Sequence, residues 1–381
     1  MRRIRHTFES MGWMTTRWHK MDPFTLMFRM TMDGERKTVN GEHMFMKWSA
    51  IGQLFVSIDL AIDRRLCTRH DRETTFINMP FEDLVHIDDC CFPPFPPLQK
   101  DARKHLEAVR DMKTNEDDVI LLTYPKCGTH WVWEIIVMLL KRKAEYHQCV
   151  REHIFLDSVD LSSLVSLPSP RVFNTHIPFR WLPQEHFRKG RKVVNIVRNP
   201  KDVAVSLYCH WHSSNELGVG SLSWSDFFEE IVVKQYKNVF GGYFGFQKEL
   251  YRAVKSNPEY SIYTMYYETL KQDSVSEILN LAGYLGVTCS RELAADIADK
   301  CSFHKLQHAS DNLKDHGEVM KIMKEMGREP PKFYRKGEVG DWKNWYTVSQ
   351  NERHDAMIKE EMKDIDFDLQ LIYESNRCYL N

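Results

Sequence analysis

The sequence predicts an α/β fold in which a central parallel sheet is flanked by helices on both faces. From Asp118 onward, short apolar runs of strand length alternate with longer segments of helical period. Apolar strands that are separated by helices form parallel sheets with helices on each side, which makes three layers. A chain of 381 residues, 43% hydrophobic and 28% charged, can bury such a core.

The elements follow one another in the order that this fold requires. The expected strands are Val119–Thr123, Val172–Thr175, Val193–Val197 and Ile262–Tyr266. The expected helices are Thr129–Lys143, Lys201–His212, Trp224–Tyr236, Phe246–Val254, Ser274–Leu285, Arg291–Lys300 and Gln350–Met362. Ligands of such sheets bind outside the carboxyl ends of the strands. The segments TYPKCGT, NTHIP and VRNPKD each end one of these strands, so we expect a site there.

The turn in TYPKCGTHW, after the first of these strands, is suited to an anion. A helix N-terminus exposes unpaired N–H groups with partial positive charge. Gly128 would let a phosphate approach the backbone, while Lys126 adds a cation and Thr129 a hydroxyl. The turn therefore predicts a P-loop-like phosphate cradle, although the chain has no Gly-Lys dipeptide and hence no Walker A loop. From these residues alone, an ordinary turn with a solvated lysine is an equal alternative.

Two further segments place cations beside turns. VRNPKDVAVSLY carries Arg198 at the end of a strand, and arginine suits bidentate phosphate recognition. FYRKGEVGDWKNW carries Arg335 and Lys336 directly before Gly337. A solvated basic turn explains either segment alone, but their joint presence favours an anionic ligand.

Composition excludes several classes of protein. A net charge of −1 favours neither nucleic acid nor an anionic membrane as a partner. Nine cysteines without a Cys-x-x-Cys pair argue against a disulfide framework and a zinc ribbon. No stretch is apolar enough to span a bilayer, and the N-terminal sequence lacks the features of a signal or transit peptide. We therefore expect a cytoplasmic location.

Residues 1–75 differ from the rest of the chain because they show no sustained period of 2 or 3.6. Three interpretations stay open: a disordered extension, a small appendage, and sequence upstream of the true start. We expect residues 76–381 to form the functional domain.

Five segments in order resemble the cytosolic sulfotransferases, over roughly residues 78–370: TYPKCGTHW, RVFNTHIPFRWLP, VRNPKDVAVSLY, YYETLKQD and RKGEVGDWKNW. The resemblance implies transfer of a sulfuryl group from 3′-phosphoadenosine 5′-phosphosulfate (PAPS) to a hydroxyl or amine, leaving 3′-phosphoadenosine 5′-phosphate (PAP). It also implies that no metal takes part. His210 and His212 could suggest a metal pair, but no ligand set accompanies them.

The resemblance also implies the roles of individual residues. His176 would be the general base, and Lys126 would stabilise the leaving nucleotide. The nucleotide site would comprise Lys126, Cys127, Gly128, Thr129, His130, Trp131, Arg198, Ser206, Tyr267, Cys301, Ser302, Phe303, Arg335, Lys336 and Gly337. Four residues depart from the family's pattern: Cys127 for serine, His130 and Cys301 for threonine, and Asn174 for lysine.

The acceptor implied by the resemblance is a small molecule: a phenol, alcohol, steroid-like compound or amine. We expect His210 and Trp211 at its pocket and Ala309–Pro331 in a lid over it. KNWYTVSQNE fits the family's dimerisation pattern, so we expect a homodimer through Lys343, Thr347, Val348 and Glu352. A plain loop before the last helix is also compatible with this segment.

Two other functions are compatible with the sequence. One is a nucleotide kinase-like phosphotransferase, which the missing Gly-Lys-Ser/Thr disfavours. The other is a non-catalytic PAP-binding protein, which Asn174 and His130 make conceivable and the intact Lys126 and His176 disfavour.

Overall fold

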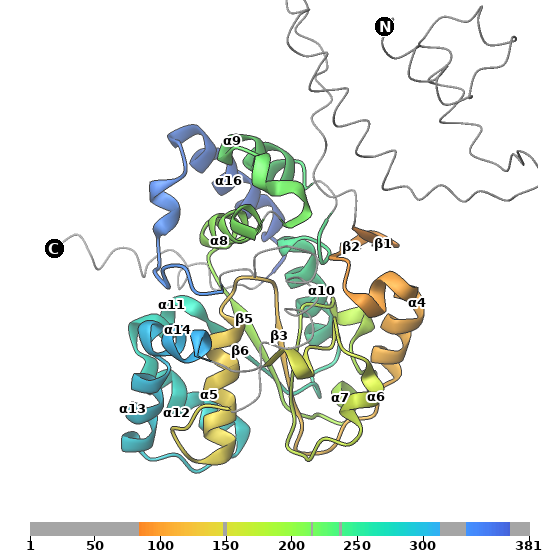
Figure 1. The fold of residues 1–381 in the computed structure, drawn as a ribbon, viewed down its shortest axis with the longest axis vertical. Helices are drawn as coiled ribbons and strands as arrows, with labels where there is room; N and C mark the ends of the chain where they lie inside the picture. Colours follow the sequence, from red (N-terminus) through yellow and green to blue (C-terminus); the bar gives the residue numbers. More distant parts are fainter. Residues whose placement is uncertain (1–83, 148–150, 215, 236–237, 313–332, 366–381) are drawn as a thin grey trace, which may run out of the picture. The chain divides into compact units, whose positions relative to one another are not determined.

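The computed structural model describes residues 84–147, 151–214, 216–235, 238–312 and 333–365. The predicted extension of residues 1–75 lies outside these described residues. At the core is a parallel sheet with the strand order β4-β3-β5-β6 (Figure 1). Its strands are β3 (Val119–Thr123), β4 (Val172–Thr175), β5 (Val193–Val197) and β6 (Ile262–Tyr266). The predicted α/β fold is therefore confirmed, with the strand bounds that the sequence indicates.

The central strands are the most apolar part of the sheet. Every residue of β3 and β5 is buried, as expected for strands that helices cover on both faces. In register, Leu121 of β3 pairs with Asn174 of β4 on one side and Val194 of β5 on the other. At the outer side of β4, Phe155 forms an isolated parallel bridge with Asn174, and the Leu156 N–H donates to the Asn174 carbonyl.

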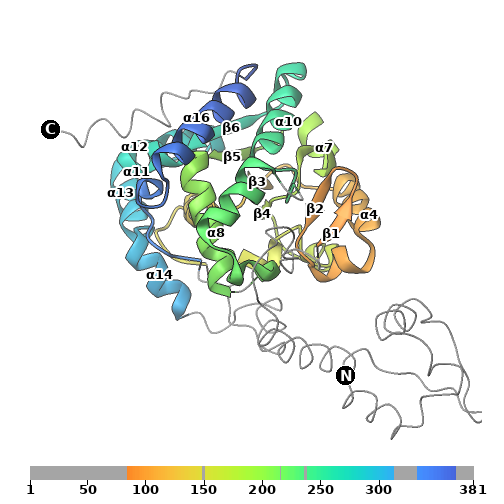
Figure 2. The same ribbon diagram turned by 90° about the horizontal axis from the view of Figure 1, so that it is seen from above.

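Helices lie on both faces of the sheet. Figures 1 and 2 show α11, α12 and α13 on one side and α4, α7 and α10 on the other. The helices are α4 (Pro96–Asp111), α5 (Thr129–Lys141), α6 (Leu161–Leu164), α7 (Gln184–Arg188), α8 (Pro200–Ser214), α9 (Trp224–Phe227), α10 (Tyr243–Ser256), α11 (Tyr267–Gln272), α12 (Ser274–Leu285), α13 (Arg291–Lys300), α14 (Phe303–Asp311) and α16 (Val348–Glu361). A small hairpin, β1 (Val85–Ile87) and β2 (Cys90–Phe92), precedes them.

The proline-rich segment is extended only as far as Phe95, whose φ of −66° and ψ of 142° are those of extended chain. Pro96 and Pro97 then open α4, a helix that the sequence did not predict. Proline is well placed in a first helical turn, because the N–H group that it lacks would have no partner there. The same prolines that favour extended chain thus mark the start of a helix.

A second difference concerns the expected helix Trp224–Tyr236. The α-helix ends at Phe227, and a π-helical turn follows over Phe228–Val233. Phe227 and Phe228 are neighbours in sequence and both are fully buried. The sequence pattern indicated one continuous helix over this segment and gave no sign of the change to a π-helical turn.

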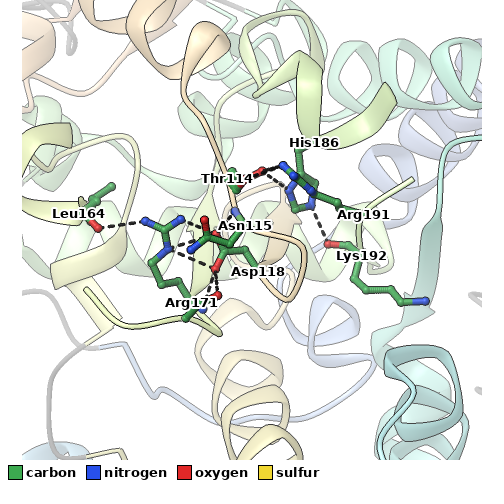
Figure 3. Close-up of polar contacts among 9 residues, drawn as sticks. Thr114, Asn115, Asp118, Leu164, Arg171, His186, Arg191 and Lys192 are labelled. Carbon is green, nitrogen blue, oxygen red and sulfur yellow. Dashed lines mark hydrogen bonds and ion pairs between the residues drawn. The ribbon is translucent and has the colours of Figure 1, made fainter. Parts of the chain in front are cut away.

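Buried polar contacts join the segments that enter the sheet (Figure 3). Asp118 directly precedes β3, and Arg171 directly precedes β4. The Asp118 carboxylate, 0% exposed, accepts from Arg171 Nε at 3.1 and 3.2 Å and from the Asn115 backbone at 2.7 Å. Arg171 Nη1 also donates to the Leu164 carbonyl at 3.0 Å. These contacts fix where two neighbouring strands begin.

His186 of α7 forms the second part of this network (Figure 3). Its Nδ1 lies 2.9 Å from the Thr114 hydroxyl, and its Nε2 lies 3.0 Å from the Lys192 carbonyl. A carbonyl only accepts, so Nε2 carries the proton and Nδ1 accepts from Thr114. This is a neutral imidazole, and burial lowers its pKa from 6.5 to about 4.

Stability should therefore fall in mild acid. Between about pH 6.5 and pH 4 the unfolded His186 binds a proton that the folded one does not, so its contribution to stability is present above pH 6.5 and lost toward pH 4. The loss is about 1.4 kcal/mol per pH unit in that window. Burial also lowers the pKa of His354, to about 3, which adds to the effect.

Thermal unfolding midpoints measured between pH 7.5 and pH 5 check this prediction. The wild-type midpoint should drop across the range, and His186→Gln should flatten the drop even if it lowers the midpoint at pH 7.5. His212→Gln, at an exposed position near the end of α8, is the control and should leave the slope unchanged. The raised pKa of Glu268 acts in the opposite direction in both proteins, so the test is the difference between their slopes. An equal slope in wild type and His186→Gln would contradict the assignment of a neutral buried imidazole.

Candidate active site

The predicted site residues meet at one edge of the sheet. His176 directly follows β4, Arg198 directly follows β5, and Tyr267 directly follows β6, while Lys126 lies in the turn after β3. Because the strands are parallel, their carboxyl ends share an edge. The structure thus brings together four residues that are far apart in the sequence.

The turn between β3 and α5 adopts an unusual backbone. Lys126 has φ of +68°, and Gly128 has φ of +110°. Positive φ in a residue other than glycine is uncommon and clusters at functional sites. A Cβ on Gly128 would lie 3.0 Å from Cδ2 of Tyr267, so glycine also allows a close approach between this turn and α11. Gly128 stands before α5 without a side chain to accept from the first-turn N–H groups, which suits an anion.

The other residues of this turn divide between core and site. Cys127 is fully buried, and burial raises the pKa of its thiol, so it contributes through its backbone rather than as a thiolate. The Thr129 hydroxyl lies 2.7 Å from that of Thr123. The Trp131 ring packs edge-on against Tyr267 with centroids 5.5 Å apart.

His130 connects α5 with the segment before the basic loop. Its ring centroid lies 4.4 Å from that of Phe333 and 5.8 Å from that of Tyr334. Phe333 also contacts His210 of α8, at 5.9 Å. The His130 imidazole therefore packs against aromatic rings of the segment that directly precedes Arg335. The family that the sequence resembles typically has threonine at this position.

His176 is held by β3 and by a buried carboxylate. Its Nδ1 lies 2.7 Å from the Thr123 carbonyl, so Nδ1 carries the proton and Nε2 holds the lone pair of the neutral ring. The His176 N–H donates to Asp157 at 3.1 Å, and the Thr175 hydroxyl donates to the same carboxylate at 2.7 Å. An imidazole in this tautomer can accept a proton at Nε2.

Aromatic rings surround this histidine. Phe155 and Phe240 lie edge-on to the His176 ring, with centroids 5.2 and 5.4 Å away. Trp211, which we expect at the acceptor pocket, is 4% exposed and packs against Phe227. Asn174 is fully buried, and its Nδ2 donates to the Ile154 carbonyl at 3.3 Å.

Arg198 connects three of the predicted segments. Its Nη1 donates to the Lys126 carbonyl at 2.8 Å, and its Nη2 donates to the Glu338 carbonyl at 3.2 Å. Its guanidinium lies over the Tyr267 ring, 4.2 Å from the centroid. Arg198 is only 7% exposed, so this cation lies at the centre of the site. Ser206 lies two turns along α8 and is half-buried.

The basic loop approaches the same place. Arg335 and Lys336 both form ion pairs with Asp341, each at 2.6 Å. Gly337 has φ of +67°, and a Cβ there would lie 2.3 Å from Cδ2 of Phe303. Only glycine fits against that ring, so the loop is packed on the start of α14.

The residues at the start of α14 differ in how far their side chains are exposed. Ser302, at the N-cap of α14, is exposed, and Phe303 is half-buried against Gly337. Cys301 is 1% exposed, and its Sγ lies 3.9 Å from the sulfur of Met138. Cys301 therefore belongs to the core beneath the site. The expected lid, Ala309–Pro331, lies outside the described residues from residue 313 onward.

Two buried N–H groups indicate that the site accommodates an anion. Within the described residues, Nε of Arg198 and Nε of Arg335 are buried without a hydrogen-bond partner. Buried donors normally have partners, and a phosphate oxygen would supply them. The cations, the close-packed Gly128 and Gly337, and these donors fit a phosphorylated ligand.

Sequence reasoning missed four carboxylates around the site. Asp157 holds His176, Asp341 holds the basic loop, and Asp202 accepts from the Gly340 and Trp342 N–H groups at 2.7 and 3.0 Å. Glu268 accepts from the Asn199 N–H at 2.8 Å, and burial raises its pKa to about 7. The available signal was the position of Asp202 and Asp341 inside the basic motifs, and that of Glu268 inside YYETLKQD, whereas Asp157 lies in none of the five segments.

The expected dimer segment is on the surface. Thr347 caps α16, and Val348 at its first turn is 75% exposed. Lys343 and Glu352 are exposed as well. Among the described residues no helix is long and apolar enough to cross a membrane. Within the same residues, no group of three or more His, Cys, Asp or Glu side chains could hold a metal ion.

Known proteins share this architecture. The model of the sulfotransferase domain family matches residues 116–366. Sulfotransferase 1B1 of the dog (Canis lupus familiaris) is 30% identical over 276 residues, which cover 67% of this chain and 87% of the dog protein. The crystal structure of mouse sulfotransferase SULT7A1 complexed with PAP aligns with a TM-score of 0.56 at 26% identity, covering 71% of this chain and 93% of that one. Retinol dehydratase in complex with androsterone and PAP aligns with a TM-score of 0.58 at 22% identity, over 70% of this chain and 87% of its own, and this likeness supports the fold alone.

Proposed function

The chain belongs to the sulfotransferase family, and from that premise we propose that it transfers a sulfuryl group from PAPS to a hydroxyl or amine of a small molecule. The observation that carries the proposal is the position of Arg198, which donates to the Lys126 turn and to the loop after Gly337 and lies over Tyr267. Arg198 contacts all three segments, and its Nε is a buried N–H group without a hydrogen-bond partner among the described residues. Such a cation suits a nucleotide that carries two anionic groups.

The nucleotide would lie across the carboxyl edge of the sheet. Arg198, Ser206, Arg335, Lys336 and Gly337 would hold its 3′-phosphate. Lys126, the N–H groups after Cys127 and Gly128, Thr129 and His130 would face its 5′-phosphosulfate. The rings of Trp131, Tyr267 and Phe303, together with Ser302, would enclose the adenine, with Cys301 supporting them from the core.

His176 would act as the general base in direct transfer without a metal. As the acceptor oxygen attacks sulfur, Nε2 would take its proton, while the bond from sulfur to the 5′-phosphate oxygen breaks and PAP leaves. Lys126 would stabilise the negative charge that develops on that oxygen. The Thr123 carbonyl keeps the His176 ring in the tautomer that this step needs.

The acceptor would be apolar around its reacting group. Phe155 and Phe240 flank His176, so an acceptor hydroxyl that reaches Nε2 would pass between aromatic rings. Phenols, apolar alcohols, steroid-like compounds and amines all satisfy this requirement.

Transfer of radiolabelled sulfuryl from PAPS to a simple phenol tests the proposal. Product formation is expected, and none should appear with adenosine 5′-phosphosulfate at the same concentration, because that donor lacks the 3′-phosphate. Phosphoryl transfer from ATP instead would indicate a kinase-like enzyme. Tight PAP binding with no transfer to any phenol, alcohol or amine would indicate a non-catalytic nucleotide-binding protein.

We also propose that the transferase domain comprises residues 76–381, that residues 1–75 are an extension, and that the protein is cytoplasmic. The matched range of the family model begins at residue 116. Among the described residues, Cys90, Cys127, Cys209, Cys289 and Cys301 are free thiols, as suits a reducing compartment. Loss of PAP binding on deletion of residues 1–75 would contradict the domain boundary.

A homodimer through Lys343, Thr347, Val348 and Glu352 completes the proposal. A two-fold contact is self-complementary, so Val348 would lie near its symmetry mate, and its 75% exposure in one chain suits such a contact. Val348→Glu would bring like charges together in a small interface. We expect this variant to sediment as a monomer and still bind PAP.

Val165→Glu is the matched control, because Val165 is similarly exposed, at 81%, but lies after α6. It should leave the sedimentation coefficient unchanged. Wild-type protein that sediments as a monomer at micromolar concentration would end the dimer proposal, as would a Val348→Glu variant that remains dimeric.

A further inference from the structure

We propose that Asp341 is a positioning residue for the 3′-phosphate, which it serves by fixing the side chains of Arg335 and Lys336. The inference rests on the proposed function. Asp341 Oδ2 accepts from Arg335 Nη2 at 2.6 Å, and Oδ1 accepts from Lys336 Nζ at 2.6 Å and from Asn344 Nδ2 at 3.0 Å. The carboxylate is 1% exposed, so one buried anion holds two cations of the basic loop.

The two cations need such support because their side chains are long and partly exposed, at 27% for Arg335 and 44% for Lys336. Fixing rotamer-rich side chains at the moment of binding lowers affinity, whereas fixing them in advance does not. Asp341 can do this at neutral pH. Burial opposes its ionisation, but the hydrogen bonds from Lys336, Asn344 and Arg335 outweigh burial and hold its pKa at about 2.

The ion pairs do not use up the donors that a phosphate requires. Guanidinium has five N–H donors, and Asp341 engages Nη2 of Arg335. Nε of the same side chain is buried and has no partner among the described residues. Within the cluster of Arg335, Lys336 and Asp341, two cations against one carboxylate leave one net positive charge. Asp341 therefore orients the two cations without neutralising both.

A second buried carboxylate, that of Asp202, links the loop around Asp341 to the helix that follows Arg198. Its Oδ2 accepts from the Gly340 N–H at 2.7 Å, and its Oδ1 accepts from the Trp342 N–H at 3.0 Å. Asp202 is 2% exposed and belongs to the first turn of α8, just after Arg198. The residues on each side of Asp341 are thereby tied to the helix that follows Arg198. The two carboxylates set the positions of three cations relative to one another.

Asp341→Asn should weaken PAP binding at least about tenfold, because the loop loses the charge-assisted contacts that orient it. Binding of adenosine 5′-phosphosulfate, which lacks the 3′-phosphate, should change less than about twofold. In turnover, KM for PAPS should rise by a similar factor to the PAP dissociation constant, with little change in kcat. Asp341→Glu, which keeps the charge, should recover part of the loss.

Calorimetric titration of each full-length variant with PAP and with adenosine 5′-phosphosulfate gives these ratios. Asp118→Asn is the matched control, because it breaks another buried aspartate–arginine pair, with Arg171, at the opposite edge of the sheet. It should lower thermal stability and leave the ratio of the two affinities unchanged. If Asp341 had only a structural role, Asp341→Asn would likewise lower thermal stability and leave the ratio of the two affinities unchanged.

The outcomes separate the inference from the function on which it rests. Wild-type protein that fails to bind PAP overturns the proposed function. Wild-type binding with an unchanged affinity ratio in Asp341→Asn, or tighter PAP binding in that variant, overturns the inference alone. If Asp341→Asn does not fold, Asp202→Asn replaces it as the test, because this variant retains the Asp341 carboxylate. Asp202→Asn should also weaken binding of PAP more than binding of adenosine 5′-phosphosulfate. Equal losses for the two nucleotides would then overturn the inference.

Discussion

Replacing His176 with alanine is expected to lower sulfuryl transfer by about 10²–10⁴-fold, the range typical of a lost general base. The Thr123 carbonyl accepts from Nδ1–H, which leaves Nε2 as the basic atom at the carboxyl edge of the sheet. The alanine variant removes that base. PAP affinity should persist, because the cations and aromatic rings assigned to the nucleotide are unchanged.

Single-turnover transfer from radiolabelled PAPS measures the effect on chemistry, and calorimetry with PAP measures binding. His212→Ala is the control, since His212 is exposed and stacks on Tyr208. Transfer within a few-fold of wild type in His176→Ala would remove His176 from the mechanism. A comparable loss in the His212 variant would show that the assay responds to general destabilisation.

Replacing Arg198 with alanine is expected to weaken PAP binding about 10- to 100-fold, and adenosine 5′-phosphosulfate binding much less. Hydrogen bonds to charged groups are worth about 1.5–3 kcal/mol, and the second ligand has no 3′-phosphate with which to form them. The variant also leaves the carbonyls of Lys126 and Glu338 without this donor. Some loss for both ligands is therefore expected, and the difference between them reports the phosphate contact.

Arg198→Lys separates charge from geometry. Lysine keeps the cation, but it lacks the planar fork that reaches two carbonyls and a phosphate together. It should fall between wild type and alanine. Arg353→Ala removes an exposed arginine paired with Glu229 and should leave both affinities unchanged. Equal losses for the two nucleotides in Arg198→Ala would contradict the assignment of Arg198 to the 3′-phosphate.

Local sequence patterns predicted the bounds of a strand or helix correctly where the residues that end or cap the element lie directly beside its apolar residues. The strands β3 to β6 have the predicted bounds because each is a short apolar run ended by polar or turn residues. Helices α12 and α13 also match, since Asp273 and Ser290 cap them with side-chain hydrogen bonds. The helix after Pro96 was not predicted, although its buried residues Leu98, His105, Leu106 and Val109 have helical spacing. The π-helical turn after Phe227 was not predicted either, because the sequence pattern indicated one continuous helix there.

In the candidate site, too, local motifs indicated some features, and tertiary packing determined the others. The strand-end motifs indicated which residues meet, and they do lie together at one edge of the sheet. The sequence could not show which carboxylate faces which cation. Asp341 and Asp202 lie within basic motifs, but their partners are set by how the loop after Gly337 packs on α8. Cys301 is assigned to the site from its motif, and the contact of its side chain with Met138 in the core could not be read from the sequence.

The polar network of Figure 3 lies at the edge where the strands begin, away from the edge that carries the site. An engineer could therefore treat the two ends of one sheet as separate design problems. Replacing His186 with a residue that cannot be protonated, and repacking its hydrogen bonds to Thr114 and Lys192, could widen the pH range of the protein without touching Lys126 or His176. Substitutions that change acceptor choice near His176 would then be exposed to a smaller loss of stability in mild acid.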